Sequence, residues 1–198
     1  MTRPETRRRQ LLLALAGLLV LVGAVAAVAL PSGDDATPEP RRSRVLPAFV
    51  QDPTRRALVP AFERAARAER LPVALLEALA WRESQWDAAA VNAESGALGI
   101  GQLLPETATF VATELLGEPD LDPADAQDNI RLTARYLRAL IERFGGDVAT
   151  GVAAYLQGST SVANDGVSTQ TADYVSQIMT LRDEFAAAAR GGEGTVSR

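Results

Sequence analysis

The chain has no histidine, no cysteine and no lysine, so all 20 of its basic residues are arginines. These absences exclude Ser-His-Asp and Cys-His nucleophiles, Schiff-base chemistry on lysine and the commoner zinc ligand sets. Without cysteine there is also no disulfide framework and no lipid-modified cysteine. If this chain is an enzyme, its carboxylates must carry out proton transfer.

Basic residues are fewer than acidic residues beyond the N-terminal region. From residue 45 onwards, 13 arginines stand against 21 acidic residues, a net charge of about −8. Phosphate binding requires a basic footprint, so this balance argues against nucleic acid as a partner. A net negative charge by itself does not identify a substrate.

Long apolar runs are absent from the chain except at residues 11–30, which carry no charge. A run of this length is sufficient to span a bilayer as a helix. The four arginines between residues 3 and 9 favour a cytoplasmic N-terminus and an exported remainder. A cleaved signal peptide is the alternative, because Ala27-Val28-Ala29 resembles a cleavage site, but signal cores usually span only ~7–15 residues. We therefore expect a single-pass membrane protein with its C-terminal domain outside the cytoplasm, or a secreted protein if the segment is cleaved.

The rest of the chain is expected to form one mainly α domain. Proline and charge mark residues 31–53 as a linker that follows a basic cytoplasmic tail at 1–10. Helical periodicity dominates the domain, 54–187, and residues 188–198 are expected to be a disordered tail. No run of strands is visible. The expected helices are about 54–70, 72–86, 105–116, 123–144, 147–157 and 169–187. Two glycine-containing stretches, 88–104 and 158–168, are predicted to be loops that line a cleft.

An acidic residue, Glu83, continues the apolar stripe of the second expected helix. Leucines 75, 76 and 79 recur at helical spacing, and the same face reaches Glu83 and then Trp86. Desolvation on such a face raises the pKa of a carboxyl group, and a carboxylic acid protonated near neutrality is a general acid. Trp86 would supply the apolar wall that keeps it protonated. The structural alternative is a Glu83 paired with a nearby arginine, namely Arg82, Arg131 or Arg135.

Four short motifs follow one another in the chain: Glu83-Ser84-Gln85-Trp86, residues 96–102 (GALGIGQ), Ala153-Ala154-Tyr155, and Thr171 to Val175. With Asn129-Ile130 and Tyr136-Leu137 in the fourth expected helix, they resemble the soluble lytic transglycosylase domain. This is a lysozyme-like fold that cleaves bacterial peptidoglycan. The resemblance covers about residues 55–185.

The resemblance implies a role for each motif. Glu83 would be the single catalytic acid and base, and Ser84 would orient it or contact the sugar. Gln102 would reach the cleft from the glycine-rich loop, Tyr155 would form a hydrogen bond near the acid, and Tyr174 would close the same region from the last helix. Trp86 and Gly99 complete the substrate-binding candidates, since a glycine lets the backbone approach a ligand closely.

One carboxylate is sufficient in the reaction that the resemblance implies. Glu83 protonates the oxygen between N-acetylmuramic acid (MurNAc) and N-acetylglucosamine (GlcNAc), and the MurNAc 6-hydroxyl closes a 1,6-anhydro ring, without metal or cofactor. The partner is then the glycan strand of peptidoglycan. Two departures from the usual motifs, Leu156 in place of an asparagine and Gln170 in place of a glutamate, weaken polar contacts around the site. The alternatives are a lysozyme-type hydrolase and a catalytically impaired, membrane-tethered glycan-binding module.

Overall fold

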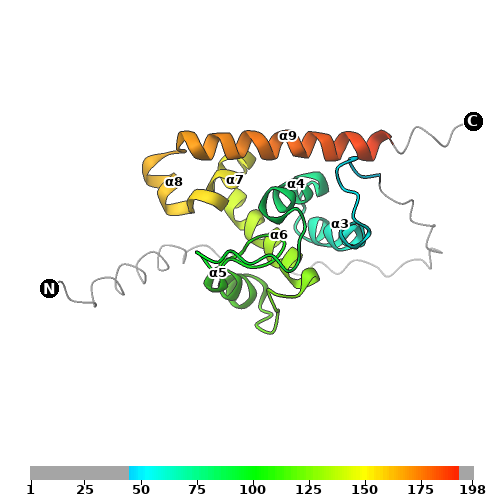
Figure 1. Cartoon of the computed structure of the whole chain (residues 1–198). Helices are drawn as coiled ribbons and strands as arrows, with labels where there is room; N and C mark the ends of the chain where they lie inside the picture. Colours follow the sequence, from blue (N-terminus) through cyan, green and yellow to red (C-terminus); the bar gives the residue numbers. More distant parts are fainter. Residues whose placement is uncertain (1–44, 192–198) are drawn as a thin grey trace, which may run out of the picture. The chain divides into compact units, whose positions relative to one another are not determined.

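The structure is a computed structural model that describes residues 45–191, and these are mainly helical, as expected (Figure 1). No strand is formed in this part of the chain, which contains only isolated bridges between Val91, Leu98 and Leu103. The expected membrane or signal segment at 11–30 and the basic tail at 1–10 lie outside the described residues. None of the helices at 45–191 has the length and apolar character needed to cross a bilayer.

The first expected helix is divided in two. Helix α2 (Pro53–Arg56) is capped by the Asp52 side chain, and α3 (Val59–Ala68) starts again two residues after Ala57. The division has a physical cause in Pro60, which lies in the first turn of α3. Proline lacks the N–H that would continue the hydrogen bonding of a preceding helix, but it is tolerated in a first turn.

Helix α4 (Val73–Ser84) forms the centre of the domain and is buried along residues 74–80. It packs against α3 and against α9 (Thr169–Gly191), the long helix that runs along one side of the domain (Figure 1). Helix α4 ends two residues earlier than expected, because Gln85 and Trp86 both adopt left-handed backbone conformations. Helix α9 ends later than expected, so that the start of the expected disordered tail is helical as far as Gly191.

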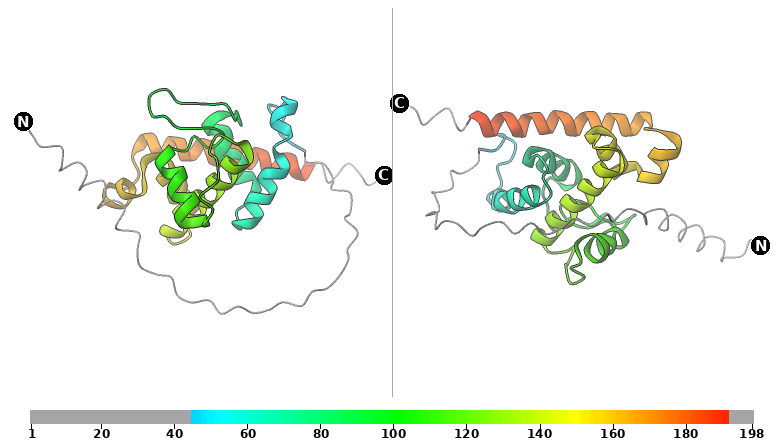
Figure 2. Two further views of the ribbon diagram at one scale, coloured as in Figure 1. Left: turned by 90° about the horizontal axis from the view of Figure 1, so that it is seen from below. Right: turned by 180° about the vertical axis from the view of Figure 1, so that it is seen from behind.

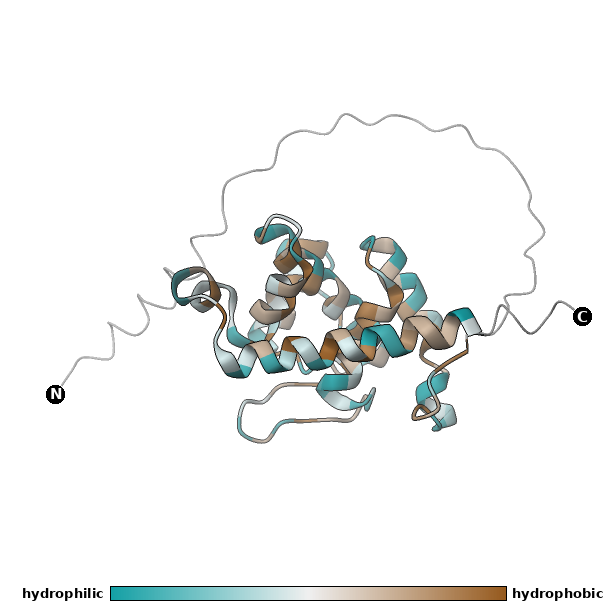
Figure 3. Ribbon diagram, turned by 90° about the horizontal axis from the view of Figure 1, so that it is seen from above, coloured by the Kyte–Doolittle hydropathy of each residue, from teal (hydrophilic) through white to brown (hydrophobic). Residues whose placement is uncertain are grey.

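The remaining elements are α5 (Pro105–Phe110), the π-helix η1 (Val111–Leu116), α6 (Ala126–Arg143), α7 (Val148–Gln157) and α8 (Ser159–Asp165). The stretch 158–168 was expected to be a loop, and this expectation is wrong because α8 occupies most of it. The stretch 88–104 is irregular, as expected, and part of it extends beyond the helices as a loop (Figure 2, left). Helices coloured by hydropathy alternate between apolar and polar stretches, as amphipathic helices do (Figure 3).

The end of the expected linker belongs to the packed domain. Leu46 and Val50 are buried in the main core. The ring of Phe49 lies 5.1 Å from that of Trp81 and 5.6 Å from that of Phe185 on α9. The linker boundary at residue 53 is therefore too late, because these apolar side chains bury their surface against α4 and α9.

Candidate active site

Glu83 lies in the last turn of α4, half-buried, and its Oε1 accepts a hydrogen bond from the hydroxyl of Tyr174 on α9. Burial raises the pKa of Glu83 above the usual value for a glutamate, while the Tyr174 hydrogen bond and the charge of Arg82 act in the opposite direction. Desolvation outweighs both. This is the direction expected from the apolar stripe, and it suits a group that must deliver a proton.

The arginine-paired alternative for Glu83 does not describe the structure. Arg82 donates from Nε to Gln177 Oε1 at 2.9 Å, and its guanidinium lies 5.6 Å from the centre of the Tyr174 ring. The other two candidates have acidic partners elsewhere: Arg131 pairs with Glu118, and Arg135 pairs with Glu69 and Glu142. Within residues 45–191 none of the ion pairs includes Glu83.

The glycine-rich loop is fixed to α4 and α7 by two hydroxyl groups. Ser84 Oγ donates to the carbonyl of Ile100 at 2.8 Å, and the Tyr155 hydroxyl donates to the carbonyl of Gly101 at 2.6 Å. Ser84 thus contacts the loop rather than the Glu83 carboxylate, and the partner of Tyr155 is the loop backbone. Both residues hold the loop beside the end of α4.

Asn129, on α6, fixes the same loop from a third side. Its Oδ1 accepts from the Gly101 N–H at 2.8 Å, while its Nδ2 donates to the carbonyls of Leu98 at 3.0 Å and Pro123 at 2.8 Å. The side chain is buried, so its amide satisfies backbone groups that water cannot reach. Asn129 belongs to a motif of the fourth expected helix, and the sequence alone predicts no role for its side chain.

Close packing against α6 explains the glycines of the loop. A Cβ at Gly99 would lie 2.6 Å from Asn129 Nδ2, and a Cβ at Gly101 would lie 1.9 Å from Thr133 Oγ1. Gly99 is buried, and its N–H donates to the carbonyl of Ala90 at 2.8 Å. The contact with α6 is therefore a structural reason for glycine at position 99, and the approach of a ligand to it stays a prediction.

Gln102 uses its side-chain donors within the loop. Its Nε2 donates to the carbonyls of Ala90 at 3.2 Å and Gly99 at 3.0 Å. The side chain is half-buried and the backbone is left-handed, with φ of 48°. Gln102 closes the turn, and in this arrangement its amide nitrogen is engaged.

Trp86 is a core residue, which corrects the expectation that it contacts substrate. Its side chain is 1% exposed, its Nε1 donates to the carbonyl of Glu77 at 2.9 Å, and its ring lies 4.5 Å from that of Phe62 and 5.4 Å from that of Phe185. The expectation assumed that α4 continues to residue 86. Because Trp86 itself has φ of 62°, the chain leaves the helix and places the indole in the core.

The two tyrosines near Glu83 remain protonated phenols. Burial raises the pKa of both Tyr155 and Tyr174, and the negative charge of Glu83 raises each pKa further. Each hydroxyl is therefore a hydrogen-bond donor at physiological pH. Glu83 and Tyr174 are in direct contact, and Tyr155 is near enough to respond to the same charge.

Of the two residues after Tyr155, Leu156 faces solvent and Gln157 forms hydrogen bonds within the protein. Leu156 is 48% exposed. Gln157 donates from Nε2 to Ser161 Oγ at 3.0 Å and to the carbonyl of Gly166 at 2.9 Å, and its Oε1 accepts from the Ser168 N–H at 3.1 Å. Gln157 thus joins the end of α7 to α8 and to the segment that enters α9.

Across residues 45–191 there is no group of three acidic side chains arranged to hold a metal ion.

The helical domain thus places the half-buried Glu83 beside a glycine-rich loop. The family described as Transglycosylase SLT domain matches residues 60–178, more than half of the chain. The chain belongs to this family.

One curated protein and two solved structures are similar to this chain. The peptidoglycan transglycosylase gp16 of Escherichia phage T7 is 31% identical over 103 residues, which cover 52% of this chain and 8% of that protein. Two solved structures share the fold. They are the lytic transglycosylase Slt of Pseudomonas aeruginosa in an inactive mutant (TM-score 0.59, 23% identity) and the 70 kDa soluble lytic transglycosylase of Escherichia coli (TM-score 0.58, 22% identity). Each match covers 65% of this chain and 24% of the solved chain, so this chain corresponds to a small part of these relatives.

Proposed function

We propose that this chain is a peptidoglycan lytic transglycosylase with Glu83 as its acid and base. The observation that carries the proposal is the half-buried Glu83, with its raised pKa and with Tyr174 as its hydrogen-bond donor. Membership of the SLT family supports the assignment. The name of the phage relative supports peptidoglycan as the substrate.

In the first step, the Glu83 carboxylic acid gives its proton to the oxygen between MurNAc and GlcNAc. The bond from MurNAc C1 to that oxygen breaks, and the GlcNAc side leaves as an alcohol. Positive charge develops at C1, and the N-acetyl group of MurNAc stabilises it. Tyr174 remains hydrogen-bonded to Glu83, and a bond from a phenol becomes stronger as the carboxylate forms.

In the second step, the ionised Glu83 removes the proton of the MurNAc 6-hydroxyl. The O6 atom bonds to C1, which closes the 1,6-anhydro ring and returns Glu83 to its acid form. No water is consumed. The same carboxyl group serves both steps, as expected where a raised pKa lets it be protonated at the start of each cycle.

The environment of Asp87 supports a mechanism with one carboxylate. Most glycosidases use two carboxylates on either side of the bond that is cleaved. Asp87 is the acidic residue nearest to Glu83 in sequence, and it is exposed and accepts from the Ala89 N–H at 2.9 Å. It caps the turn after α4, which leaves Glu83 as the acid of the site.

We propose structural roles for the neighbouring residues. Tyr174 positions the Glu83 carboxyl group, and Ser84 and Tyr155 hold the glycine-rich loop beside it through Ile100 and Gly101. Direct contacts of Ser84, Gln102 and Gly99 with the glycan stay predictions. A substrate would have to displace or share the hydrogen bonds that these groups form within the protein.

We also propose that residues 11–30 tether the domain to the membrane, with the C-terminal part outside the cytoplasm. The uncharged apolar run and the arginines that precede it support this topology. External protease added to intact cells should then degrade the domain and leave a membrane-bound fragment. Release of the domain into the medium, with an N-terminus near Leu30, would instead establish a cleaved signal peptide.

The function is tested by digestion of purified cell-wall sacculi with the full-length chain, followed by mass spectrometry of the products. Products ending in 1,6-anhydro-MurNAc are expected. Reducing MurNAc ends would establish a lysozyme-type hydrolase instead. Glu83→Gln should lower the cleavage rate by ~10²–10⁴-fold or more, since one group serves both steps. Asp87→Asn is the matched control and should cleave at the rate of the unmodified chain.

A catalytically impaired glycan-binding module is the second candidate, because the exposed Leu156 follows Tyr155 where the family usually has an amide. Sedimentation of the chain with sacculi in the absence of any soluble product would favour it. Leu156→Asn would then restore the polar group at an exposed position, with little effect on stability.

A further inference from the structure

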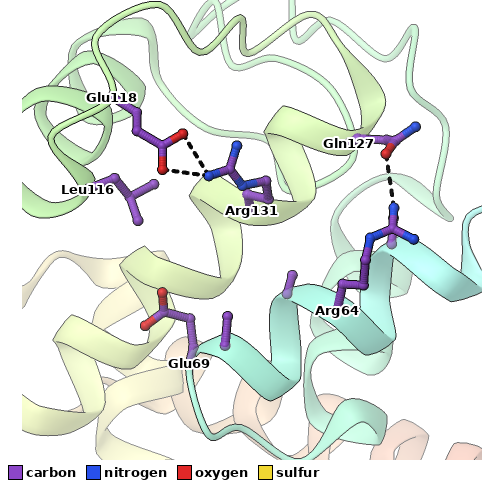
Figure 4. A pocket seen from close by; sticks show the side chains of 9 residues that line it. Arg64, Glu69, Leu116, Glu118, Gln127 and Arg131 are labelled. Atoms are coloured by element: carbon purple, nitrogen blue, oxygen red, sulfur yellow. Dashed lines mark hydrogen bonds and ion pairs between the residues drawn. The ribbon is translucent and has the colours of Figure 1, made fainter. Parts of the chain in front are cut away.

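A pocket of about 370 Å³ lies between α3, the end of η1 and the start of α6 (Figure 4). Its volume is at the small end of the ~300–1,000 Å³ typical of ligand sites. Alanines of α3 and Leu116 provide apolar surface, and the charged side chains around it are Arg64 of α3, Arg131 of α6, and Glu69 and Glu118, which follow the ends of α3 and η1. The size suits a small molecule or the end of a polymer.

The pocket is separate from the site around Glu83. Gln127 and Arg131 of α6 line the pocket, whereas Asn129 and Thr133 of the same helix face the glycine-rich loop. A step of two residues turns a helix by about 200°. The pocket therefore lies on the opposite face of α6 from the loop that Tyr155 holds.

Glu69 lies at one end of the pocket (Figure 4). Its side chain is 15% exposed, and its ion-pair partner, Arg135 Nη1, is 3.5 Å away. Within residues 45–191 its carboxylate accepts no hydrogen bond. A largely buried carboxylate is costly unless it is hydrogen-bonded. Glu69 can therefore accept a hydrogen bond from a ligand ammonium.

Arg64 lies at the other end (Figure 4) and donates from Nη2 to Gln127 Oε1 at 2.9 Å. A guanidinium has five N–H donors. Within residues 45–191 Arg64 forms no ion pair, so it retains donors for a carboxylate. Arg131, in contrast, is already paired with Glu118, at 2.6 Å. The two ends of the pocket thus present opposite charges.

The charged side chains of the pocket disfavour several classes of ligand. The carboxylates of Glu69 and Glu118 disfavour a phosphate or another polyanion, and the two arginines disfavour a metal cation. No aromatic ring lines the pocket on which a sugar or a base could stack. A ligand with both an ammonium and a carboxylate complements the charges at both ends of the pocket.

The volume of the pocket and the charges at its two ends suit a short peptide. Glu69 follows Arg64 by five residues and is the first residue after α3, so the two backbone positions are about 7.5 Å apart along the helix axis. Two extended residues span about 7 Å. We propose that this pocket binds a peptide of two or three residues, with its ammonium at Glu69 and its carboxylate at Arg64.

Two sources share this chemistry. One is an ordinary free peptide with its α-ammonium and C-terminal carboxylate. The other is a peptide stem of peptidoglycan, whose diamino residue offers a side-chain ammonium, and this source rests on the proposed function. Alanyl-alanine represents the first source, and Nα-acetyl-L-lysyl-D-alanyl-D-alanine represents the second.

The test is calorimetric titration of the purified full-length chain with each peptide, with ¹⁵N-resolved NMR to locate the bound peptide. Binding of at least one peptide is expected, with shifts on α3 and the start of α6. Acetylation of its ammonium or amidation of its carboxylate should weaken binding about tenfold, because each removes a charge-assisted hydrogen bond. The peptide that binds more tightly identifies the source.

Variants place the ligand in the pocket. Arg64→Gln and Glu69→Gln should each weaken binding about tenfold, since each removes one charged partner of the peptide. Arg67→Gln and Glu63→Gln, on the same helix but outside the pocket, are the matched controls and should bind as the unmodified chain does. Arg64 is exposed, so its variant keeps the test independent of any folding defect at Glu69.

Absence of binding by both peptides would overturn the proposal. So would binding that persists in both pocket variants, or shifts confined to the surroundings of Glu83. These measurements use no glycan and no turnover. A failure of the proposed cleavage activity would therefore leave their result unchanged.

Discussion

The Tyr174 hydroxyl on α9 donates a hydrogen bond to the Glu83 carboxylate at the end of α4, and it thereby joins two residues that are 91 positions apart in the chain. The bond stabilises the ionised form of Glu83 and so lowers its pKa, whereas burial raises it by a larger amount. Tyr174 is 5% exposed and its own pKa is raised, so the phenol keeps its proton. The acidity of Glu83 thus depends on a contact that one substitution can remove.

Tyr174→Phe should raise the pKa of Glu83 further, because it removes the hydrogen bond that favours the carboxylate and keeps the ring that buries it. A general acid is active below its pKa. The basic limb of the kcat/KM profile on sacculi should therefore move to higher pH. Tyr136→Phe is the control, because Tyr136 packs against Tyr155 without bonding to Glu83, and its basic limb should not move. A basic limb that stays in place or moves to lower pH in Tyr174→Phe would contradict this account.

Glu83→Gln should become more stable relative to the unmodified chain as pH rises. The folded pKa of Glu83 is raised above the unfolded value of about 4.3, so the folded state binds this proton more tightly. The stabilisation that results is complete below about pH 4 and is lost as pH rises through the folded pKa. Glutamine does not titrate, and its Oε1 can still accept from Tyr174.

Urea unfolding of both proteins from pH 4 to pH 8 measures this difference. The free energy of unfolding of Glu83→Gln, relative to that of the unmodified chain, should be higher at pH 8 than at pH 4. For Asp87→Asn the same difference should not change with pH. A large loss of stability in Glu83→Gln at pH 8 would mean that an ionised Glu83 is itself a structural partner.

Asn129→Ala should destabilise the domain by about 2–4 kcal/mol. The substitution removes the partners of the Gly101 N–H and of two carbonyls, and each buried group left unsatisfied costs ~1–3 kcal/mol before the loop relaxes. Urea unfolding gives the free energy directly. The control is Asn92→Ala, because Asn92 Oδ1 accepts from the Glu94 and Ser95 N–H groups in an exposed turn, and its loss should cost less than about 1 kcal/mol. Equal losses in the two variants would contradict the role of Asn129.

Much of the fold follows from periodicity, and the exceptions have local causes. The apolar stripe of α4 correctly indicated that Glu83 is partly buried with a raised pKa. The same stripe failed at Trp86, because a change to left-handed backbone after Ser84 is not visible in the spacing of apolar residues. Helix α8 was missed because residues 158–168 have the composition of a loop. The Gln157 side chain, which lies outside that stretch, donates hydrogen bonds to Ser161 Oγ in α8 and to the carbonyl of Gly166 just after it.

The support around the site could not be predicted from local sequence. Asn129 forms its hydrogen bonds with Leu98 and Gly101, about thirty residues away, and only the fold shows which backbone groups need a partner. The contact of Gly101 with Thr133 is likewise not visible in the local sequence. A glycine in a loop usually indicates a turn or a close approach, and the sequence does not say which.

Gly101→Ala should therefore test the packing of the loop against α6. The backbone of Gly101 is not left-handed, so a methyl group here is opposed by contact alone, and its Cβ would lie 1.9 Å from Thr133 Oγ1. Overpacking of this kind costs ~1–3 kcal/mol or more. The loop should shift, and this should weaken the hydrogen bond from Tyr155 to the Gly101 carbonyl. Both the rate of sacculus cleavage and the free energy of unfolding should therefore fall.

Thr133→Ala should partly rescue Gly101→Ala, because it removes the two nearest atoms, Oγ1 and Cγ2, and leaves Cβ at 3.0 Å. A double-mutant cycle by urea unfolding should give a favourable coupling of at least about 1 kcal/mol, as expected for residues in contact. Thr133→Ser is the matched control, since it keeps Oγ1 and should give less relief. Additive losses in the cycle with alanine would show that contact with Thr133 is not what requires glycine at position 101.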